Sequence, residues 1–300
     1  MFQVLYGPIL GTVMSLLLLI NTILWALPVY LMIPLKLLAP TPGIRDRLSR
    51  GMAALAQGWG VSNVWLGDTL LGIRWDIRIS AELKRDAQYL ICSNHQTWND
   101  IYVLLKTFGH KAPFFRFFLK KQLIWVPILG PVWWGLDYPF MNRYSREHLQ
   151  KNPDLRVRDM EITRKACEKY ARIPVSILNF LEGTRFTQEK HDRQLSPYRY
   201  LLKPKAGGFA FALNAMGERL SSLLDVTIVY PEGAKSFWDF LTGRVHRVIV
   251  DVRALRIPSE FFQGNYETDV EFHRLINTWV ANLWEEKDRR IEQLLAQSTA

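Results

Sequence analysis

Hydrophobic residues dominate the first 35 positions of the chain, which contain no charged side chain, and the first charged residue is Lys36. The most apolar stretches are residues 16–20 and 23–27. About 20 apolar residues can cross a bilayer as a helix, so this segment predicts one membrane helix with some tilt. Three prolines and Asn21 interrupt the segment, which leaves a short helical hairpin or a re-entrant pair as the alternative.

Basic residues follow the apolar segment at positions 36, 45, 47 and 50. Lys and Arg concentrate on the cytoplasmic side of membrane helices, so we expect the chain after residue 36 to be cytoplasmic, at the inner membrane if the source is a bacterium. A cleaved signal peptide fits less well, because the start of the chain lacks basic residues and the apolar stretch is too long. We therefore divide the chain into a membrane-anchoring segment, residues 1–40, and a second domain, residues 41–300.

Helical and strand patterns alternate beyond residue 40. We expect a linker over residues 40–52 and an irregular apolar loop over residues 124–135. The alternation of apolar and polar residues over 73–79 predicts a strand. Further strands are predicted at 174–181, 224–231 and 245–255, and helices at 53–71, 155–171, from 203 onward, and 270–283. This order of elements indicates an α/β fold.

The stretch 91–100, Ile-Cys-Ser-Asn-His-Gln-Thr-Trp-Asn-Asp, lies between an apolar strand pattern and an apolar helix pattern. Asn94 and Thr97 are residue types common in turns and at helix N-termini. We therefore expect His95 at the point where a strand gives way to a helix. Asp100 follows after four intervening residues. If the chain turns between them, the carboxylate can hold one imidazole nitrogen and leave the other facing a substrate.

A His–Asp pair without its own nucleophile suits a reaction in which the substrate supplies the hydroxyl. Ser93 and Thr97 are poor candidates for a nucleophile, and no Gly-x-Ser-x-Gly motif occurs in the chain. The alternative is a buried, hydrogen-bonded histidine without a catalytic role. The spacing alone favours that alternative, so the interpretation depends on companion motifs.

The net charge of +10 and the apolar content of 49% fit a folded protein that binds nucleic acid or an anionic membrane. Residues 111–158 contain nine Lys or Arg against three Asp or Glu, interleaved with aromatic residues. Beside an apolar anchor, this pattern favours a bilayer-facing surface over a solvated basic face. Nucleic acid is not favoured, because no binding motif accompanies the charge. Cys92 and Cys167 give neither a disulfide framework nor a metal-ligand cluster, so we expect no metal site.

Two arginines are candidates for binding a phosphate group. Glu182-Gly183-Thr184-Arg185 follows a predicted strand, so a cation lies beside a glycine turn where the backbone can approach a phosphate. Arg143, behind a short apolar stretch, is the second candidate. A guanidinium matches phosphate oxygens in a bidentate way. Each residue alone also fits a structural salt bridge, but together with the His–Asp pair they form a plausible substrate-binding set.

Four motifs occur in order: Asn-His-Gln-Thr-Trp-Asn-Asp at 94–100, Phe-Met-Asn-Arg at 140–143, Phe-Leu-Glu-Gly-Thr-Arg at 180–185 and Val-Thr-Ile-Val-Tyr-Pro at 226–231. They resemble the four motifs of the glycerophospholipid acyltransferases. The chain is similar to the bacterial 1-acylglycerol-3-phosphate acyltransferases and to the longer lysophospholipid acyltransferase branch. The resemblance runs over residues 85–235 and implies an acyltransferase domain with a mixed β-sheet flanked by helices.

The resemblance also implies a mechanism. His95 would deprotonate the free glycerol hydroxyl of a lysophospholipid, with 1-acylglycerol-3-phosphate as the expected acceptor and phosphatidic acid as the product. The hydroxyl would attack the thioester of acyl-CoA or acyl carrier protein, while Asp100 orients His95 and stabilises the imidazolium. Arg143 and Arg185 would hold the glycerol phosphate, and Glu182 would position the acceptor or Arg185. The apolar residues 124–136 would line an acyl tunnel.

The expected partners are the phospholipid bilayer, a lysophospholipid and an acyl thioester, with acyl carrier protein as one of two donors and no nucleic acid. No cofactor is expected, because the thioester is a substrate. Three alternatives stay open: transfer to other lysophospholipids, hydrolysis of lipid esters, and a non-enzymatic protein that binds anionic lipid. The sequence leaves the preferred acyl chain, the donor and the oligomeric state undetermined.

Overall fold

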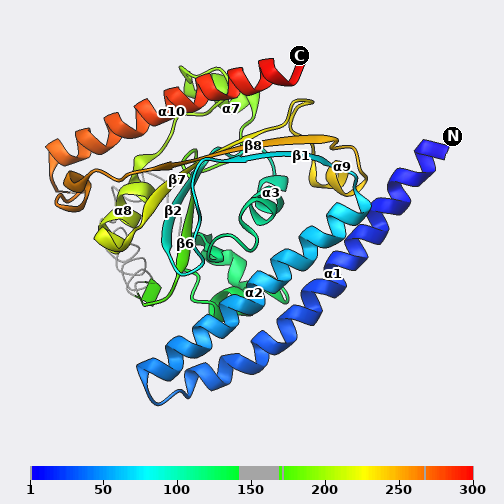
Figure 1. Cartoon of the computed structure of the whole chain (residues 1–300), viewed down its shortest axis with the longest axis horizontal. Helices are drawn as coiled ribbons and strands as arrows, with labels where there is room; N and C mark the ends of the chain where they lie inside the picture. Colours follow the sequence, from blue (N-terminus) through cyan, green and yellow to red (C-terminus); the bar gives the residue numbers. More distant parts are fainter. Residues whose placement is uncertain (1, 142–168, 171, 267, 300) are drawn as a thin grey trace.

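A six-stranded sheet with helices on both faces forms the centre of the computed structural model, which describes residues 2–141, 169–170, 172–266 and 268–299 (Figure 1). Its strands are β1 (Arg74–Ile79), β2 (Gln88–Ser93), β3 (Phe115–Arg116), β6 (Val175–Phe180), β7 (Ser222–Val229) and β8 (Arg247–Leu255). The helices are α1 (Phe2–Leu37), α2 (Pro42–Leu70), α3 (Asn99–Phe108), α4 (Leu129–Gly135), α7 (Gln188–Gln194), α8 (Ala206–Met216), α9 (Phe237–Leu241) and α10 (Val270–Thr299). The short strands β4 (Leu119–Lys120) and β5 (Phe140–Met141) pair separately, and 3₁₀ turns lie at Lys121–Trp125, Gly217–Arg219 and Ser259–Phe262.

The sheet is mixed, with the strand order β1-β8-β7-β2-β6-β3. β2 runs parallel to both β6 and β7, β3 runs parallel to β6, and β7 runs antiparallel to β8. The prediction of a mixed sheet flanked by helices is therefore confirmed. As a consequence of the parallel pairing, β2, β6 and β7 all end at the same edge of the sheet.

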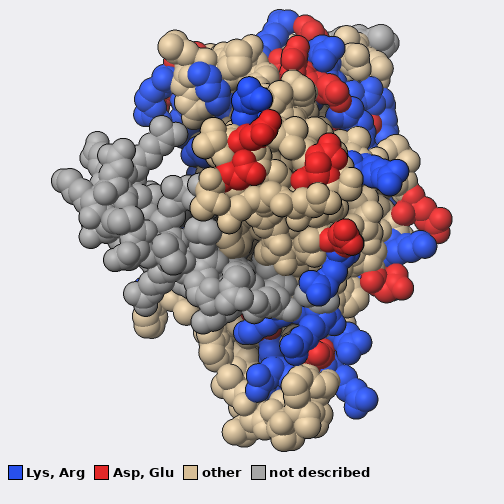
Figure 2. Space-filling view, turned by 90° about the vertical axis from the view of Figure 1, so that its left-hand side faces the viewer, with Lys and Arg blue, Asp and Glu red and all other residues tan. Residues whose placement is uncertain are grey.

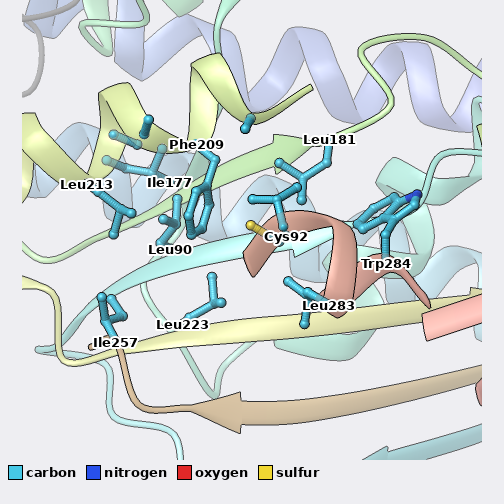
Figure 3. Close-up of a cluster of buried hydrophobic side chains, with 14 of the residues drawn as sticks. Leu90, Cys92, Ile177, Leu181, Phe209, Leu213, Leu223, Ile257, Leu283 and Trp284 are labelled. Carbon is cyan, nitrogen blue, oxygen red and sulfur yellow. The ribbon is translucent and has the colours of Figure 1, made fainter. Parts of the chain in front are cut away.

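The central strand β2 is buried on both faces. Leu90 and Cys92 point into a core formed with side chains of α8 and α10 (Figure 3), whereas Tyr89 and Ile91 point into a second core beneath α3. Successive side chains of a strand alternate between its faces, so a strand covered on both sides needs an uninterrupted apolar run. That requirement explains why β2 was recognisable from its sequence.

The helical hairpin at the N-terminus forms between α1 and α2, not within α1. The prolines in α1 do not end the helix, so the re-entrant alternative for this segment is wrong. The predicted linker over residues 40–52 is also wrong, because α2 already begins at Pro42. The Thr41 hydroxyl accepts a hydrogen bond from the amide of Ile44 (3.4 Å), and proline fits the first position of a helix, so this Thr-Pro pair starts α2.

α1 packs against the rest of the molecule near both of its ends. Near the N-terminus, Gly11 lies so close to Thr242 that an added Cβ would stand 2.7 Å from that side chain. Near the C-terminus, the Tyr30 hydroxyl donates to the Ile128 carbonyl oxygen (2.9 Å) and the Lys36 ammonium to the Gly135 carbonyl oxygen (2.7 Å). The axis of α1 therefore runs along the surface of the domain (Figure 1).

The basic, aromatic stretch that begins at residue 111 is only partly a surface. Phe115 and Arg116 are buried in β3, so the expected bilayer-facing surface is wrong for these two residues. Trp125 is 85% exposed and does lie on the surface. The loop predicted over residues 124–135 contains α4 instead. Most of the predicted helix 155–171 and the candidate residue Arg143 lie outside the described residues.

Candidate active site

The ends of β2, β6 and β7 bring three of the four motifs to one edge of the sheet. His95 follows β2 by two residues, Glu182 follows β6 by two residues, and Tyr230 comes directly after β7. In open α/β sheets, ligands bind beyond the carboxyl ends of the strands. The fold therefore gathers side chains that are far apart in the sequence at the edge where a site is expected.

His95 and Asp100 form the pair that their spacing predicted. The His95 Nδ1 atom lies 2.8 Å from Asp100 Oδ2, and the ring of Phe180 stacks on the imidazole with 4.0 Å between ring centroids. The His95 side chain keeps 15% of its surface exposed, whereas that of Asp100 has none. Nε2 makes no hydrogen bond with the described residues, so the imidazole is oriented on one side and available on the other.

Asp100 is held at the start of α3 by several donors. The amides of Gln96 (2.6 Å) and Thr97 (3.0 Å) donate to Oδ2, which also faces His95. The residue lies in the first turn of the helix, where the helix dipole stabilises a negative charge. These contacts favour the ionised carboxylate, which can only accept, so His95 Nδ1 is the donor in the pair.

Tyr230 is a member of the site that the sequence did not identify. Its hydroxyl donates to Asp100 Oδ1 (2.7 Å), and its side chain is buried. Burial raises the pKa of Tyr230 well above its ordinary value, and the nearby Asp100 carboxylate raises it further. The phenol therefore stays protonated and remains a donor. Its place directly after an apolar strand was the available signal, but nothing in the sequence connects it with Asp100.

Glu182 is buried beneath the His95 loop. Its Oε1 accepts from the backbone amide of His95 (2.9 Å), and its Oε2 accepts from the amide of Leu202 (3.2 Å). Burial raises the pKa of Glu182 to about 8, although the two amide hydrogen bonds act in the opposite direction. The carboxyl group thus ties the loop after β2 to the segment that precedes α8.

The turn after Glu182 presents several cations. Gly183 has φ +68°, a conformation that side chains disfavour, and an added Cβ would lie 3.3 Å from Lys205 Nζ. Thr184 accepts a hydrogen bond from Lys190 Nζ (2.9 Å). The Arg185 guanidinium lies over the indole ring of Trp98 at 4.7 Å. Trp98 is three residues from His95, so this stack links the turn to the histidine loop.

The nucleophilic side chains next to His95 are occupied or inert. The Ser93 hydroxyl donates to the Asn94 carbonyl oxygen (3.0 Å), and the Thr97 hydroxyl donates to the Lys235 carbonyl oxygen (2.7 Å). Cys92 is fully buried, and burial raises the pKa of its thiol. These residues hold the loop in place, which leaves the incoming substrate as the source of the nucleophile. Among the described residues no group of three or more His, Cys, Asp or Glu could hold a metal ion.

Comparison with known proteins agrees with this geometry. The mouse 1-acyl-sn-glycerol-3-phosphate acyltransferase gamma is 26% identical over 181 residues, which are 56% of this chain and 43% of that protein. The human 1-acyl-sn-glycerol-3-phosphate acyltransferase delta is 26% identical over 189 residues, which are 60% of this chain and 45% of that protein. The chain therefore spans about half the length of the curated relatives that it matches.

A solved structure extends the likeness beyond the motifs. The crystal structure of the 1-acyl-sn-glycerophosphate (LPA) acyltransferase PlsC from Thermotoga maritima matches with a TM-score of 0.50 over 92% of this chain and 97% of that chain. The sequence identity is 14%, so this likeness concerns the fold. The Acyltransferase family model matches residues 74–234, more than half of the chain, and includes the His95 pair, Glu182 and Tyr230. The chain belongs to the Acyltransferase family.

Proposed function

We propose that this protein is an O-acyltransferase that moves an acyl chain from a thioester to the free hydroxyl of 1-acylglycerol-3-phosphate, giving phosphatidic acid. The observation that supports this most strongly is the His95–Asp100 pair, oriented by hydrogen bonds and flanked by hydroxyl and thiol groups that are hydrogen-bonded or buried. The names of the two relatives, both 1-acyl-sn-glycerol-3-phosphate acyltransferases, point to the same acceptor.

In the proposed reaction, His95 Nε2 takes the proton of the acceptor hydroxyl as its oxygen attacks the thioester carbonyl carbon. The resulting imidazolium stays paired with Asp100. Collapse of the tetrahedral intermediate breaks the carbon–sulfur bond, and the imidazolium returns the proton to the leaving sulfur. An ester and a free thiol result, and no acyl-enzyme intermediate is needed.

Arg185 is the proposed ligand of the acceptor phosphate. Its guanidinium lies on Trp98, beside the histidine loop, and Lys205 lies against Gly183 in the same turn. The cations here would recognise a phosphate by its negative charge and by the hydrogen bonds that its oxygens accept. A headgroup without net charge would be bound less strongly. Arg143 is proposed as a second ligand on the basis of its motif alone. Acyl-CoA and acyl carrier protein both stay candidates for the donor.

We further propose that α1 lies in the plane of the membrane interface and does not cross the bilayer. Its residues 6–37 are long and apolar enough to span a membrane. However, the domain contacts α1 from Gly11 to Lys36, a distance of about 38 Å along a helix, which exceeds the roughly 30 Å hydrocarbon core. If α1 crossed the bilayer, polar residues of the attached domain would enter the hydrocarbon core. A helix in the interface plane avoids the free-energy cost of burying those residues.

Release of free thiol from oleoyl-CoA tests the proposed reaction. We expect release to depend on added lysophosphatidic acid and to be much slower with lysophosphatidylcholine, with phosphatidic acid found by mass spectrometry. Arg185→Ala should raise the KM for lysophosphatidic acid more than the KM for oleoyl-CoA, whereas Arg193→Ala, an exposed arginine on α7, should change neither. Thiol release at the same rate without an acceptor would instead indicate a thioester hydrolase.

A further inference from the structure

A cleft of about 540 Å³ opens where the C-terminal end of α1 meets the start of α2, α4 and the residues after α4. Its apolar wall includes Leu37 and Trp134, which are 60% and 46% exposed. Its polar lining includes the cations Lys36, Arg45 and Lys169. None of its lining residues belongs to the site around His95, so the arrangement of that site does not explain the cleft.

The cleft has more positive than negative charge. The Lys36 ammonium pairs with Asp137. The Lys169 ammonium also pairs with Asp137, with 3.0 Å between its Nζ and Oδ1. Burial disfavours ionisation of Asp137, but the two lysines outweigh it and hold the pKa of Asp137 below its ordinary value. Arg45 has no ion-pair partner among the described residues. Among the described lining residues, three cations therefore face one carboxylate, a net charge of +2.

A fourth cation lies behind the cleft. Arg116 is only 2% exposed, and its Nη1 has no hydrogen-bond partner within the described part of the chain. Its guanidinium lies over the ring of Tyr170 at 4.8 Å, and the Tyr170 hydroxyl donates to the Asp137 carbonyl oxygen (2.7 Å). Arg116 is also close enough to repel the Lys36 ammonium. A buried donor without an acceptor is costly, so an acceptor oxygen that reaches Nη1 would be stabilised.

The position of the cleft identifies the kind of anion. Figure 2 shows Lys and Arg side chains gathered towards the lower end of the displayed face, where the turn between α1 and α2 lies. Arg45, Arg47 and Arg50 are exposed in this part of α2. The neighbouring end of α1 exposes Leu35, Leu37 and Leu38 by 57%, 60% and 80%. Cationic and apolar surfaces thus meet at one place, as the headgroup and the chains of a phospholipid do.

We propose that this cleft binds one anionic phospholipid of the surrounding membrane, with its phosphate at Arg45 and Lys169 and an acyl chain along Leu37 and Trp134. A free phosphate would use the cations but leave the apolar wall exposed to water, whereas a phospholipid satisfies both. The proposed phosphate ligands Arg45 and Lys169 belong neither to the His95 site nor to the stretch 124–136 that the family resemblance assigns to an acyl tunnel, so their variants test lipid binding apart from acyl transfer.

Native mass spectrometry of the full-length protein in a neutral detergent tests the proposal. With phosphatidylglycerol as the probe, we expect one bound lipid, and much weaker binding of phosphatidylcholine. The double variant Arg45→Gln/Lys169→Gln should bind phosphatidylglycerol at least tenfold more weakly. The matched control Arg47→Gln/Arg50→Gln removes the same charge nearby, but neither arginine lines the cleft, so its affinity should stay within twofold of wild type.

Three results would overturn the proposal. Equal loss of binding in both double variants would mean that the cations attract lipid as a diffuse patch. Equal binding of phosphatidylcholine would remove the role of charge. Displacement of the lipid by inorganic phosphate at the same concentration would identify a phosphate site and not a lipid site. Thiol release, measured in parallel, reports on the proposed acyltransferase activity separately.

Discussion

Asp100 connects His95 to the rest of the proposed active site. One oxygen faces His95 and two backbone amides, and the other accepts the hydroxyl of Tyr230. A carboxylate with its oxygens occupied in this way cannot rotate without losing hydrogen bonds. The imidazole is consequently held with Nε2 outward, which is the orientation that a general base requires.

Tyr230→Phe tests the part of this network that the sequence did not reveal. The variant keeps the ring but loses the donor to Asp100 Oδ1, which leaves more negative charge on the carboxylate for the His95 imidazolium. We expect kcat/KM for acyl transfer to fall about tenfold, the size of one hydrogen bond to a charged group. The unfolding midpoint reports separately on the packing of the ring, which the variant keeps. Activity within twofold of the wild type would show that the hydrogen bond from Tyr230 to Asp100 does not support His95.

The raised pKa of Glu182 predicts a pH-dependent stability. The folded protein keeps a proton on Glu182 up to about pH 8, whereas the unfolded chain releases it near the ordinary value of 4.5. The folded state therefore binds more protons within this window, and the free energy of unfolding should fall as the pH rises from about 4.5 to about 8. The slope approaches ~1.4 kcal/mol per pH unit for one proton.

Glu182→Gln provides the comparison, because glutamine does not titrate. Unfolding in urea should give a flatter dependence on pH for the variant than for the wild type between pH 5 and pH 8. The variant should also be less stable at high pH, since its amide nitrogen faces a backbone amide that needs an acceptor. Parallel curves for the two proteins would show that Glu182 is not the titrating group.

At the residue scale, local spacing predicted the His95–Asp100 pair because His95 lies in the loop after β2 and Asp100 in the first turn of α3, only five positions later. The hydrogen bond of Tyr230 to Asp100 joins residues 130 positions apart, and no local pattern encodes such a contact. Arg116 was misassigned to the surface for a related reason. Charge predicts exposure on average, but the strand in which Arg116 lies is covered by neighbouring elements.

At the element scale, the exposed face of α1 is a continuous apolar stripe. Its large side chains recur every three or four residues, the spacing of one helix face, at Tyr6, Ile9, Val13, Leu16, Ile20, Leu24, Leu27, Leu31 and Leu35. The other face packs on α2, α4 and α9. An apolar stripe outward and a packed face inward are what a helix lying in a membrane interface requires.

Substitution within this stripe separates membrane attachment from folding. Leu24→Ser/Leu31→Ser removes two exposed apolar side chains, and we expect at least tenfold weaker binding to phospholipid vesicles, because each buried leucine contributes about 1.5–3 kcal/mol. The thermal unfolding midpoint should not change, since neither side chain is packed. Leu195→Ser/Val270→Ser, which removes two exposed apolar residues elsewhere, is the control and should bind as the wild type does. Equal vesicle binding by all three proteins would contradict an inserted α1 stripe.

The elements that the sequence predicted well are those whose pattern is local. The strands β2, β6 and β7 are apolar runs bounded by turn residues, and each lies where its pattern indicated. The start of α2 was missed because Pro42 is usually a helix breaker, although at the first helical position it starts a helix. The packing of α1 along the domain depends on contacts with α4 and α9, which only the folded chain brings together.

At the scale of the whole molecule, the sheet edge and the apolar face of α1 belong to one body. The chain places a His–Asp pair at the carboxyl ends of parallel strands, and the same domain rests on an apolar helix with a cationic turn at one end. In the proposed reaction, the lipid acceptor would come from the membrane and the acyl donor from water. The proposed function therefore depends on one chemical step, the activation of the acceptor hydroxyl by His95.

The most direct test compares thiol release from oleoyl-CoA, in the presence of lysophosphatidic acid, for the wild type, His95→Ala and His246→Ala. His246 also pairs with a carboxylate, Glu232 at 2.7 Å, but its side chain is 61% exposed and it is not part of the proposed site. Loss of a general base costs about 10²–10⁴ in rate. We predict such a loss for His95→Ala, with an unchanged unfolding midpoint, and wild-type turnover for His246→Ala. Turnover by folded His95→Ala above about a tenth of the wild-type rate would contradict the role of His95 as the general base.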